Sequence, residues 1–345
     1  MAELKIQPKF KFQQRLAFGC CLLALVVIML GAYVRLSDAG LGCPDWPGCY
    51  GQLTVPSTSD EVASANASYP QRPLETTKAW KEMAHRYLAG TLGLAIALLA
   101  ALAWKNRVNA QQPKLLPGLL LATVTFQALL GMWTVTLLVK PLIVTSHLLG
   151  GLATVSMLWL LSLRLQEQPG HKLQRPRLFY FALLGLLILV MQVFLGGWTS
   201  TNYAAIGCTE FPTCINQSWW PPMDFSEAFV LWRGLGVDYE HGVLEYSART
   251  AIHMTHRIGA LITACYLGLL AWRLAQSDQQ AKVRFAAKAL LALLLVQLVL
   301  GVTNVLAQLP LAVAVAHNGV AAMLVLSMLT LLFRLRMPSA ELNQR

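Results

Sequence analysis

Charged side chains are scarce in this chain, and their scarcity excludes a soluble protein of this size. Asp, Glu, Lys and Arg make up 12% of the 345 residues, whereas 56% of the residues are hydrophobic. Soluble domains carry about 25% charged residues. Acidic residues are the scarcer kind, with 16 against 27 Lys and Arg, so the basic excess needs an explanation.

Long apolar runs fill most of the chain instead. Each reaches about 20 residues, the length that crosses a roughly 30 Å hydrocarbon core as a helix. We therefore predict an all-α integral membrane protein with eight transmembrane helices. No small-x-small cleavage site follows the first run, which is also too long for a signal peptide, so it is expected to remain as an anchor. The eight runs cover 16–36, 79–104, 115–138, 141–163, 178–199, 248–274, 284–306 and 310–335.

The placement of Lys and Arg explains the basic excess. With the N-terminus in the cytoplasm, 18 of the 27 Lys and Arg residues fall on the cytoplasmic side, as the positive-inside rule requires. An even number of helices returns the C-terminus to the same side. The basic character therefore follows from topology, and no nucleic-acid partner is expected.

The sequence repeats itself with a shift of 165 to 171 residues. "GAYVRLSDAGLGCPDWPGCYGQ" from Gly31 aligns with "GGWTSTNYAAIGCTEFPTCINQ" from Gly196, and the HR dipeptide of the second apolar run aligns with that of the sixth. We interpret the chain as a tandem duplication of a four-helix unit, with halves at 1–170 and 171–345. An even number of helices in each half predicts a pseudo-two-fold axis along the membrane normal.

Four histidines lie inside the predicted helices at similar depths. His85 and His147 are about six residues from the outer ends of their helices, roughly 9 Å deep at 1.5 Å per residue, and His256 and His317 repeat this arrangement. A single such histidine is usually a core residue that shares a hydrogen bond. Two cross-helix pairs instead indicate heme sites, because facing imidazoles suit a six-coordinate iron. Zinc or copper would need three or four clustered ligands, and no carboxylate or thiol completes such a set.

Arginines directly follow two of these histidines. Arg86 and Arg257 lie toward the outer ends of their helices, where they could neutralise heme propionates. The alternative is that they extend to lipid headgroups.

Cysteine pairs recur in the two long outer loops. Cys43 with Cys49, and Cys208 with Cys214, each close a short loop that contains proline. In an oxidising compartment each pair suits a local disulfide that pins its loop as a lid, and a redox shuttle is the alternative. The remaining cysteines are expected to be small apolar side chains within helices: Cys20, Cys21 and Cys265.

The two halves differ beside the first histidine of each pair. Glu82 lies three residues before His85, whereas His253 holds that position before His256. Residues three apart share a helical face, so only one predicted heme site has a carboxylate beside its ligand. A site that only carries electrons has no use for this group, whereas a site that performs chemistry can use it for proton transfer or charge stabilisation. His253 is expected to donate a hydrogen bond rather than to ligate.

These residues resemble the heme A synthase family. The motif EMAHR at 82–86, the HR repeat, the single histidines of the fourth and eighth runs and the doubled cysteine pairs carry the resemblance over essentially the whole chain. The resemblance implies a bacterial inner-membrane enzyme that oxidises the ring methyl of heme O to the formyl group of heme A for cytochrome oxidase. Heme O synthase would be its upstream partner.

The resemblance also implies residue roles. His85 and His147 would hold the substrate heme, His256 and His317 would hold a permanent heme b, and Glu82 would be the catalytic carboxylate, with both sites toward the periplasmic side. Three other readings of the residues stay open: a di-heme cytochrome b that only transfers electrons, a transporter built from tandem repeats, and a disulfide-exchange enzyme.

Overall fold

The structure is a computed structural model that describes residues 8–109, 112–166, 176–277 and 279–336. Within these ranges the chain is helical, with two isolated β-bridges and no strand. Eight of the described helices are long and apolar enough to span a membrane, which confirms the predicted all-α membrane fold. They are α1 (Pro8–Leu36), α3 (Thr76–Lys105), α4 (Leu115–Thr136), α5 (Pro141–Gln166), α6 (Arg177–Thr201), α8 (Tyr246–Gln276), α9 (Ala281–Leu306) and α10 (Leu311–Leu335).

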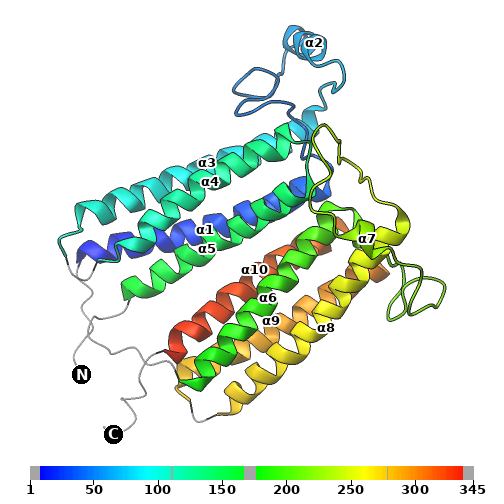
Figure 1. Ribbon diagram of the computed structural model, residues 1–345. Coiled ribbons are helices and arrows are strands. Elements are labelled where there is room, and N and C mark those ends of the chain that lie inside the picture. The colour runs from blue at the N-terminus through cyan, green and yellow to red at the C-terminus, as the bar shows by residue number, and fades with distance from the viewer. Residues whose placement is uncertain (1–7, 110–111, 167–175, 278, 337–345) are drawn as a thin grey trace, which may run out of the picture.

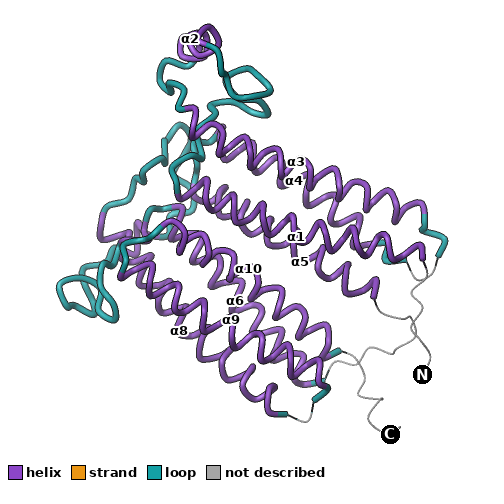
Figure 2. The backbone as a smooth tube through the Cα atoms, turned by 180° about the vertical axis from the view of Figure 1, so that it is seen from behind, coloured by secondary structure: helices purple, strands orange, loops and turns teal. Residues whose placement is uncertain are grey.

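The spanning helices form two groups of four (Figure 1). Helices α1, α3, α4 and α5 pack together, and α6, α8, α9 and α10 do the same. Between the groups, α10 packs against α1 and α5, and α5 packs against α6; Figure 2 shows the same arrangement from behind. The predicted boundary at 170/171 lies outside the described residues. The symmetry axis stays a prediction.

Each group has its own apolar core. Ile96 and Val155 are fully buried in the first, and Leu267 and Leu290 in the second. The outward faces are apolar too: Leu94 is 76% exposed. A helix that is apolar on every side belongs in lipid or in a large core, so the outward-facing leucines and phenylalanines indicate contact with acyl chains.

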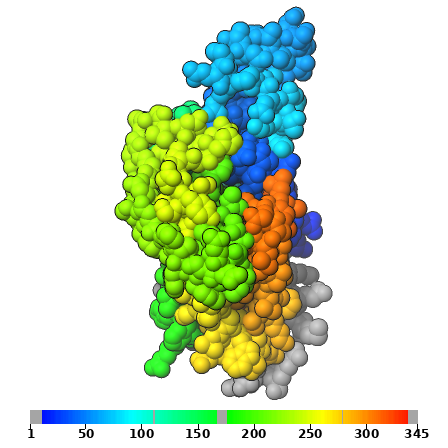
Figure 3. Space-filling model, turned by 90° about the vertical axis from the view of Figure 1, so that its right-hand side faces the viewer, coloured from blue at the N-terminus to red at the C-terminus, as the bar shows by residue number. Residues whose placement is uncertain are grey.

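The long connections lie together at one end of the bundle (Figures 1 and 2). The first contains α2 (Ser59–Ser68), and the second contains the 3-10 helix η1 (Ala204–Ile206) and α7 (Phe225–Ala228). In Figure 3 the yellow-green loop of the second group lies against the blue and cyan residues of the first. The long loops of the two groups therefore lie side by side at this end of the protein.

Part of the second loop, residues 230–241, crosses onto the first group; we name it the crossing segment. Lys140, at the start of α5, is only 2% exposed. Its Nζ donates to the carbonyl of Gly234 and lies 3.5 Å from the ring centroid of Trp232. A buried ammonium requires such an acceptor and aromatic face, so the crossing segment is specifically docked.

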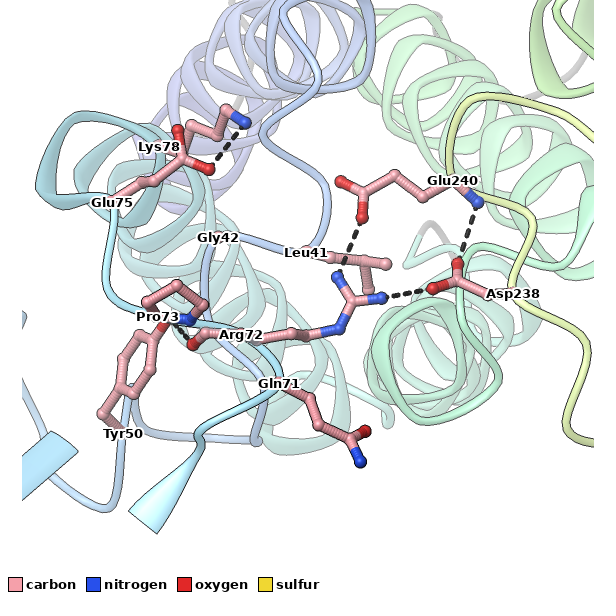
Figure 4. Close-up of a pocket in the computed structure, with 10 residues that line it drawn as sticks. All are labelled: Leu41, Gly42, Tyr50, Gln71, Arg72, Pro73, Glu75, Lys78, Asp238 and Glu240. Atoms are coloured by element: carbon pink, nitrogen blue, oxygen red, sulfur yellow. Dashed lines mark hydrogen bonds and ion pairs between the residues drawn. The ribbon is translucent and has the colours of Figure 1, made fainter. Parts of the chain in front are cut away.

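An ion-pair cluster makes a second contact between the loops (Figure 4). The guanidinium of Arg72 donates to Asp238 at 2.7 Å and to Glu240 at 2.9 Å. These three side chains line an open pocket together with Gly42 of the first loop. The pocket lies over the backbone that leads into the first disulfide loop.

Candidate functional site

The four predicted histidines lie on four different helices. His85 is on α3 and His147 on α5, whereas His256 is on α8 and His317 on α10. The rings of His85 and His147 have their centroids 6.5 Å apart. Metal–imidazole bonds of about 2.0 to 2.1 Å place two axial imidazoles with centroids roughly 6 Å apart. The separation of the first pair therefore suits two ligands of one iron.

A glycine on a neighbouring helix faces each ring. A Cβ built on Gly31 would lie 2.9 Å from Cε1 of His85, and one on Gly196 would lie 3.2 Å from Cε1 of His256. Gly131 and Gly301 face the other two rings in the same way, at 3.5 and 3.2 Å. An added Cβ would clash at Gly31 and be tight at Gly196 and Gly301, whereas 3.5 Å at Gly131 is an ordinary van der Waals contact. Close approach of backbone to ring therefore favours glycine at three of these four positions.

The surroundings of the rings fit a heme ligand better than a core residue. All four rings are half-buried rather than enclosed. The Nδ1 atoms of His85, His147 and His317 are buried and no side chain pairs with them. Backbone groups on neighbouring helices are the hydrogen-bond partners of these rings, at Val27, Gln127 and Gln297. Among the described residues no group of three His, Cys, Asp or Glu side chains could hold a metal ion. The donors present are therefore pairs of imidazoles on facing helices.

Replacing Gly31 with alanine is expected to displace the His85 ring and lower the stability of the protein. The added methyl would press on the ring, and overpacking of this kind costs about 1 to 3 kcal/mol. Gly19→Ala on the same helix is the matched control, because nothing lies within 4 Å of its Cβ. Thermal unfolding of both variants in detergent checks this, and equal melting temperatures would contradict it.

Glu82 is buried, with 5% of its surface exposed, and it is held by two donors. The backbone N–H of Cys43 donates to its Oε2 at 2.8 Å, and the guanidinium of Arg86 donates to its Oε1 at 2.5 Å. A buried carboxylate requires such charge-assisted partners. The carboxylate of EMAHR is therefore fixed in place, with one donor from its own helix and one from the first disulfide loop.

Both arginines of the predicted site bind the disulfide loops. Arg86 donates to the carbonyls of Asp45, Pro47 and Gly48. Arg257 donates to Glu210 and Thr213 at 2.6 and 2.9 Å. Binding of heme propionates by these arginines stays a prediction. The guanidinium N–H groups that would bind a propionate already donate to the disulfide loops and hold them against α3 and α8.

The predicted disulfides are present within the two loops. Cys43 and Cys49 have an S–S distance of 2.01 Å, and Cys208 and Cys214 one of 2.02 Å. Cys20 and Cys21 are buried, as expected of apolar filler, but Cys265 is exposed. Cys265 also lies within a helix, as predicted, but on an exposed face of α8.

Acidic residues that organise the disulfide loops escaped the sequence analysis. Asp45 accepts hydrogen bonds from the N–H groups of Tyr50 and Gly51 at 2.6 and 2.7 Å. Its aligned counterpart Glu210 accepts from the N–H of Gln217 and from a threonine hydroxyl, both at 2.9 Å. These donors hold the pKa of the Glu210 carboxyl below its ordinary value, the Gln217 N–H most strongly. The shift of 165 that aligns the cysteines also aligns Asp45 with Glu210. The repeat alignment could therefore have identified these two acidic residues from the sequence.

Removing the first disulfide with Cys43→Ser and Cys49→Ser is expected to loosen the loop that binds Glu82 without unfolding the helices. A loop this short contributes about 2 kcal/mol through its closure. If the chain forms heme A, as its resemblance to the heme A synthase family implies, the yield of heme A should fall about tenfold, as when a group that holds a site residue in place is lost. The matched control is Cys208→Ser with Cys214→Ser. Chromatography of extracted hemes compares the two, and an equal yield from both would contradict a specific role for the first loop.

The second half has no carboxylate at the position of Glu82. There His253 is buried, and its Nδ1 donates to the carbonyl of Ala204 at 2.9 Å. This contact ties α8 to η1. The two sites thus share imidazoles, glycines and disulfide loops, and they differ in one ionisable group.

Paired imidazoles on facing membrane helices, capped by disulfide loops, define a class: polytopic membrane proteins with bis-histidine sites near one membrane surface. The chain belongs to the cytochrome oxidase assembly protein family, whose sequence pattern matches residues 14–329.

Similar proteins from several bacteria match nearly the whole chain. The heme A synthase of Shewanella oneidensis is 46% identical over 309 residues, which span 89% of this chain and 92% of that protein. The heme A synthase of Bacillus licheniformis is 26% identical over 85% of this chain and 86% of its own length. That of Novosphingobium aromaticivorans is 28% identical over 90% and 91%.

Proposed function

We propose that this protein is a heme A synthase, which oxidises the ring methyl of heme O to the formyl group of heme A. The observation that carries the proposal is the anchored carboxylate of Glu82 beside His85, at a position that His253 occupies in the other half. Family membership and the relatives' shared activity support it. We therefore assign the reaction to the first half, which has the carboxylate, and the cofactor to the second half, which lacks it.

In the first half the substrate heme O is bound between α3 and α5. His85 and His147 would hold its iron, since their rings lie 6.5 Å apart and glycines lie beside them. The isoprenoid tail of heme O is apolar, so a bundle whose outer faces contact lipid is a suitable place to hold it.

Glu82 handles the protons of the reaction. Converting a methyl to a formyl group takes two successive two-electron oxidations. With water as the source of the formyl oxygen, the methyl group and one water give the formyl group, four protons and four electrons, and an external electron acceptor must take the electrons. The carboxylate oxygens of Glu82 lie one helical turn from His85 and are poised to accept the protons. Arg86 and the Cys43 N–H keep the carboxylate in place and stabilise its negative charge between proton transfers.

The second half would bind the resident cofactor, heme b. His256 and His317 would hold it, and the group would supply one-electron transfer when it is bound. His253 and Gly196 keep the surrounding helices in register with the ligands.

We place the protein in a bacterial inner membrane with both termini in the cytoplasm and the long loops in the periplasm. The bias of Lys and Arg toward the cytoplasmic side and the two disulfides support this orientation. A heme O synthase in the same membrane would supply the substrate.

Pigment analysis tests the proposal. The chain is expressed with a heme O synthase in cells that lack their own heme A synthase, and the extracted hemes are separated by chromatography. We expect heme A in the membranes and heme b in the purified protein. Two b-type hemes with no heme A would instead identify a di-heme cytochrome that only transfers electrons.

A further inference from the structure

We infer that Trp219 and Trp220 anchor the second long loop in the outer interface of the lipid bilayer, among the phospholipid headgroups and the first carbons of the acyl chains. We name these two residues the tryptophan pair. The inference goes beyond the proposed reaction and does not depend on it, because it requires only that the eight long helices span a bilayer. It concerns the loop between α6 and α8.

Both rings of the tryptophan pair lie on the surface of the protein. Trp219 is 58% exposed and Trp220 is 68% exposed. Within the part of the chain that the structure describes, neither indole N–H has a hydrogen-bond partner. Trp198, a buried tryptophan of the same half, instead donates its indole N–H to the carbonyl of Ala228 at 2.9 Å. An uncovered ring with a free N–H suits a membrane interface, because the ring can lie against acyl chains while the N–H reaches headgroups or water.

The length of α8 indicates where the bilayer surface lies. Helix α8 has 31 residues, which makes it about 46 Å long at 1.5 Å per residue. The hydrocarbon core is about 30 Å thick and takes about 20 of these residues. Arg273 lies in the last turn of α8 and belongs at the inner surface. Counting back about 20 residues from Arg273 puts the outer boundary of the hydrocarbon core near His253.

The second disulfide loop continues the lipid-facing surface of α8 at this depth. Leu261 and Ile258 are exposed on the outward face of the helix. One turn further out, Met254 is buried against the disulfide of Cys208 and Cys214. Figure 1 shows this part of the second loop beside the outer part of α8. The loop therefore covers the lipid-facing side of α8 where the helix leaves the hydrocarbon core, and its own outer surface faces the interface.

The tryptophan pair follows this loop directly. Arg257 of α8 donates hydrogen bonds to the loop and holds it at the depth of the boundary. The backbone N–H of Cys214 donates to the carbonyl of Ser218 at 2.9 Å, which keeps the end of the loop beside the disulfide. Trp219 is the next residue, so the pair begins at the same depth.

The segment around the pair can enter the interface without placing a charge there. Residues 211–223 contain no Asp, Glu, Lys or Arg. Pro221 and Pro222 follow the pair, and proline has no backbone N–H that would have to leave water. Phe211 of the disulfide loop is exposed as well. The composition of this segment therefore suits the headgroup region, where tryptophan is enriched.

The first half has no such pair, although its loop has the same disulfide. At the shift of 165 that aligns the cysteines, Thr54 and Val55 stand in the places of Trp219 and Trp220. Val55 is 2% exposed and belongs to the apolar cluster that contains the first disulfide. Leu53 is exposed beside it, but a single exposed leucine is ordinary on a protein surface. The fold of the loop thus does not require exposed tryptophans, and the second half has them for another reason.

The primary test measures the depth of the pair with a nitroxide spin label. The label is attached to Trp219→Cys and, as the matched control, to the aligned and exposed Thr54→Cys. Both variants carry Cys265→Ser, because Cys265 is an exposed free cysteine. The proteins are reconstituted in nanodiscs of phosphatidylethanolamine and phosphatidylglycerol. Power saturation then compares collisions of the label with oxygen, which dissolves in acyl chains, and with a water-soluble nickel chelate.

We expect the ratio of oxygen to nickel collisions to be several times higher for the label at position 219 than for the label at position 54. Equal ratios at the two positions would put the pair in water and overturn the inference. A label at position 219 that neither reagent reaches would show that protein covers the pair, as in a contact between two copies of this chain, and would overturn it as well.

A second measurement needs no new cysteine and decides the question if a labelled variant fails to fold. Wild-type protein and the double variant Trp219→Phe with Trp220→Phe are reconstituted in vesicles whose acyl chains carry bromine near the headgroups. Phenylalanine keeps an aromatic ring, so the loop should retain its fold. We expect the fluorescence removed by the double substitution to be the part that bromine quenches and aqueous iodide does not. Quenching of that part by iodide instead would contradict a lipid anchor.

Discussion

Glu82→Gln is expected to bind heme yet form almost no heme A. Glutamine keeps the shape of the side chain and can still accept the hydrogen bond from Cys43 N–H, but it carries no charge and cannot take up a proton. General acid–base groups contribute about 10² to 10⁴-fold to a rate, so heme A should fall by a factor in that range. Heme O or a partly oxidised intermediate should accumulate. The measurement is chromatography of hemes extracted from cells that also express heme O synthase.

Glu75→Gln is the matched control for this substitution. Glu75 lies at the outer end of the same helix and forms an exposed ion pair with Lys78 at 2.9 Å, which contributes about 0 to 1 kcal/mol. Its heme A yield should equal that of the wild type. A wild-type yield from Glu82→Gln would show that the charge in EMAHR is not needed for the chemistry.

His256→Ala and His317→Ala are each expected to abolish the stable heme b, and with it the formation of heme A. Alanine removes one of two axial ligands and leaves a hole beside Gly196 or Gly301. Pyridine hemochrome spectra of the purified variants measure the heme b content. His241→Ala is the control, because His241 is exposed in the outer loop. Wild-type heme b content in His256→Ala would refute the assignment of this ligand.

The helices and the histidine framework could be predicted from the sequence because both depend on patterns within single segments. An apolar run of the required length specifies a spanning helix whatever its neighbours are. The duplication provided a second, independent copy of each histidine, so His85 could be judged against His256. The disulfides were predictable because each joins cysteines only six residues apart.

Contacts between distant segments could not be predicted in this way. In the sequence Lys140 is indistinguishable from an ordinary charged residue at a helix end. Its burial depends on contacts with Trp232 and Gly234, which lie more than 90 positions later. In the sequence Gln192 is one polar residue in an apolar helix. Its contact with the His256 ring depends on how α6 packs against α8. Asp45 was recoverable from the repeat alignment alone, since it and Glu210 share a charge but not an identity.

The docking of Lys140 limits how this protein can be recombined. Its ammonium belongs to the first four-helix group, but the carbonyl and the aromatic face that accommodate it belong to the crossing segment. A chimera joined near residue 170 would combine a lysine from one parent with a crossing segment from the other. If the second parent's crossing segment follows another path or lacks an aromatic residue at position 232, the buried charge loses its partners, at a cost of about 1 to 3 kcal/mol or more. Functional hybrids of such parents therefore need a second junction beyond the crossing segment, so that residues 230–241 travel with the N-terminal donor.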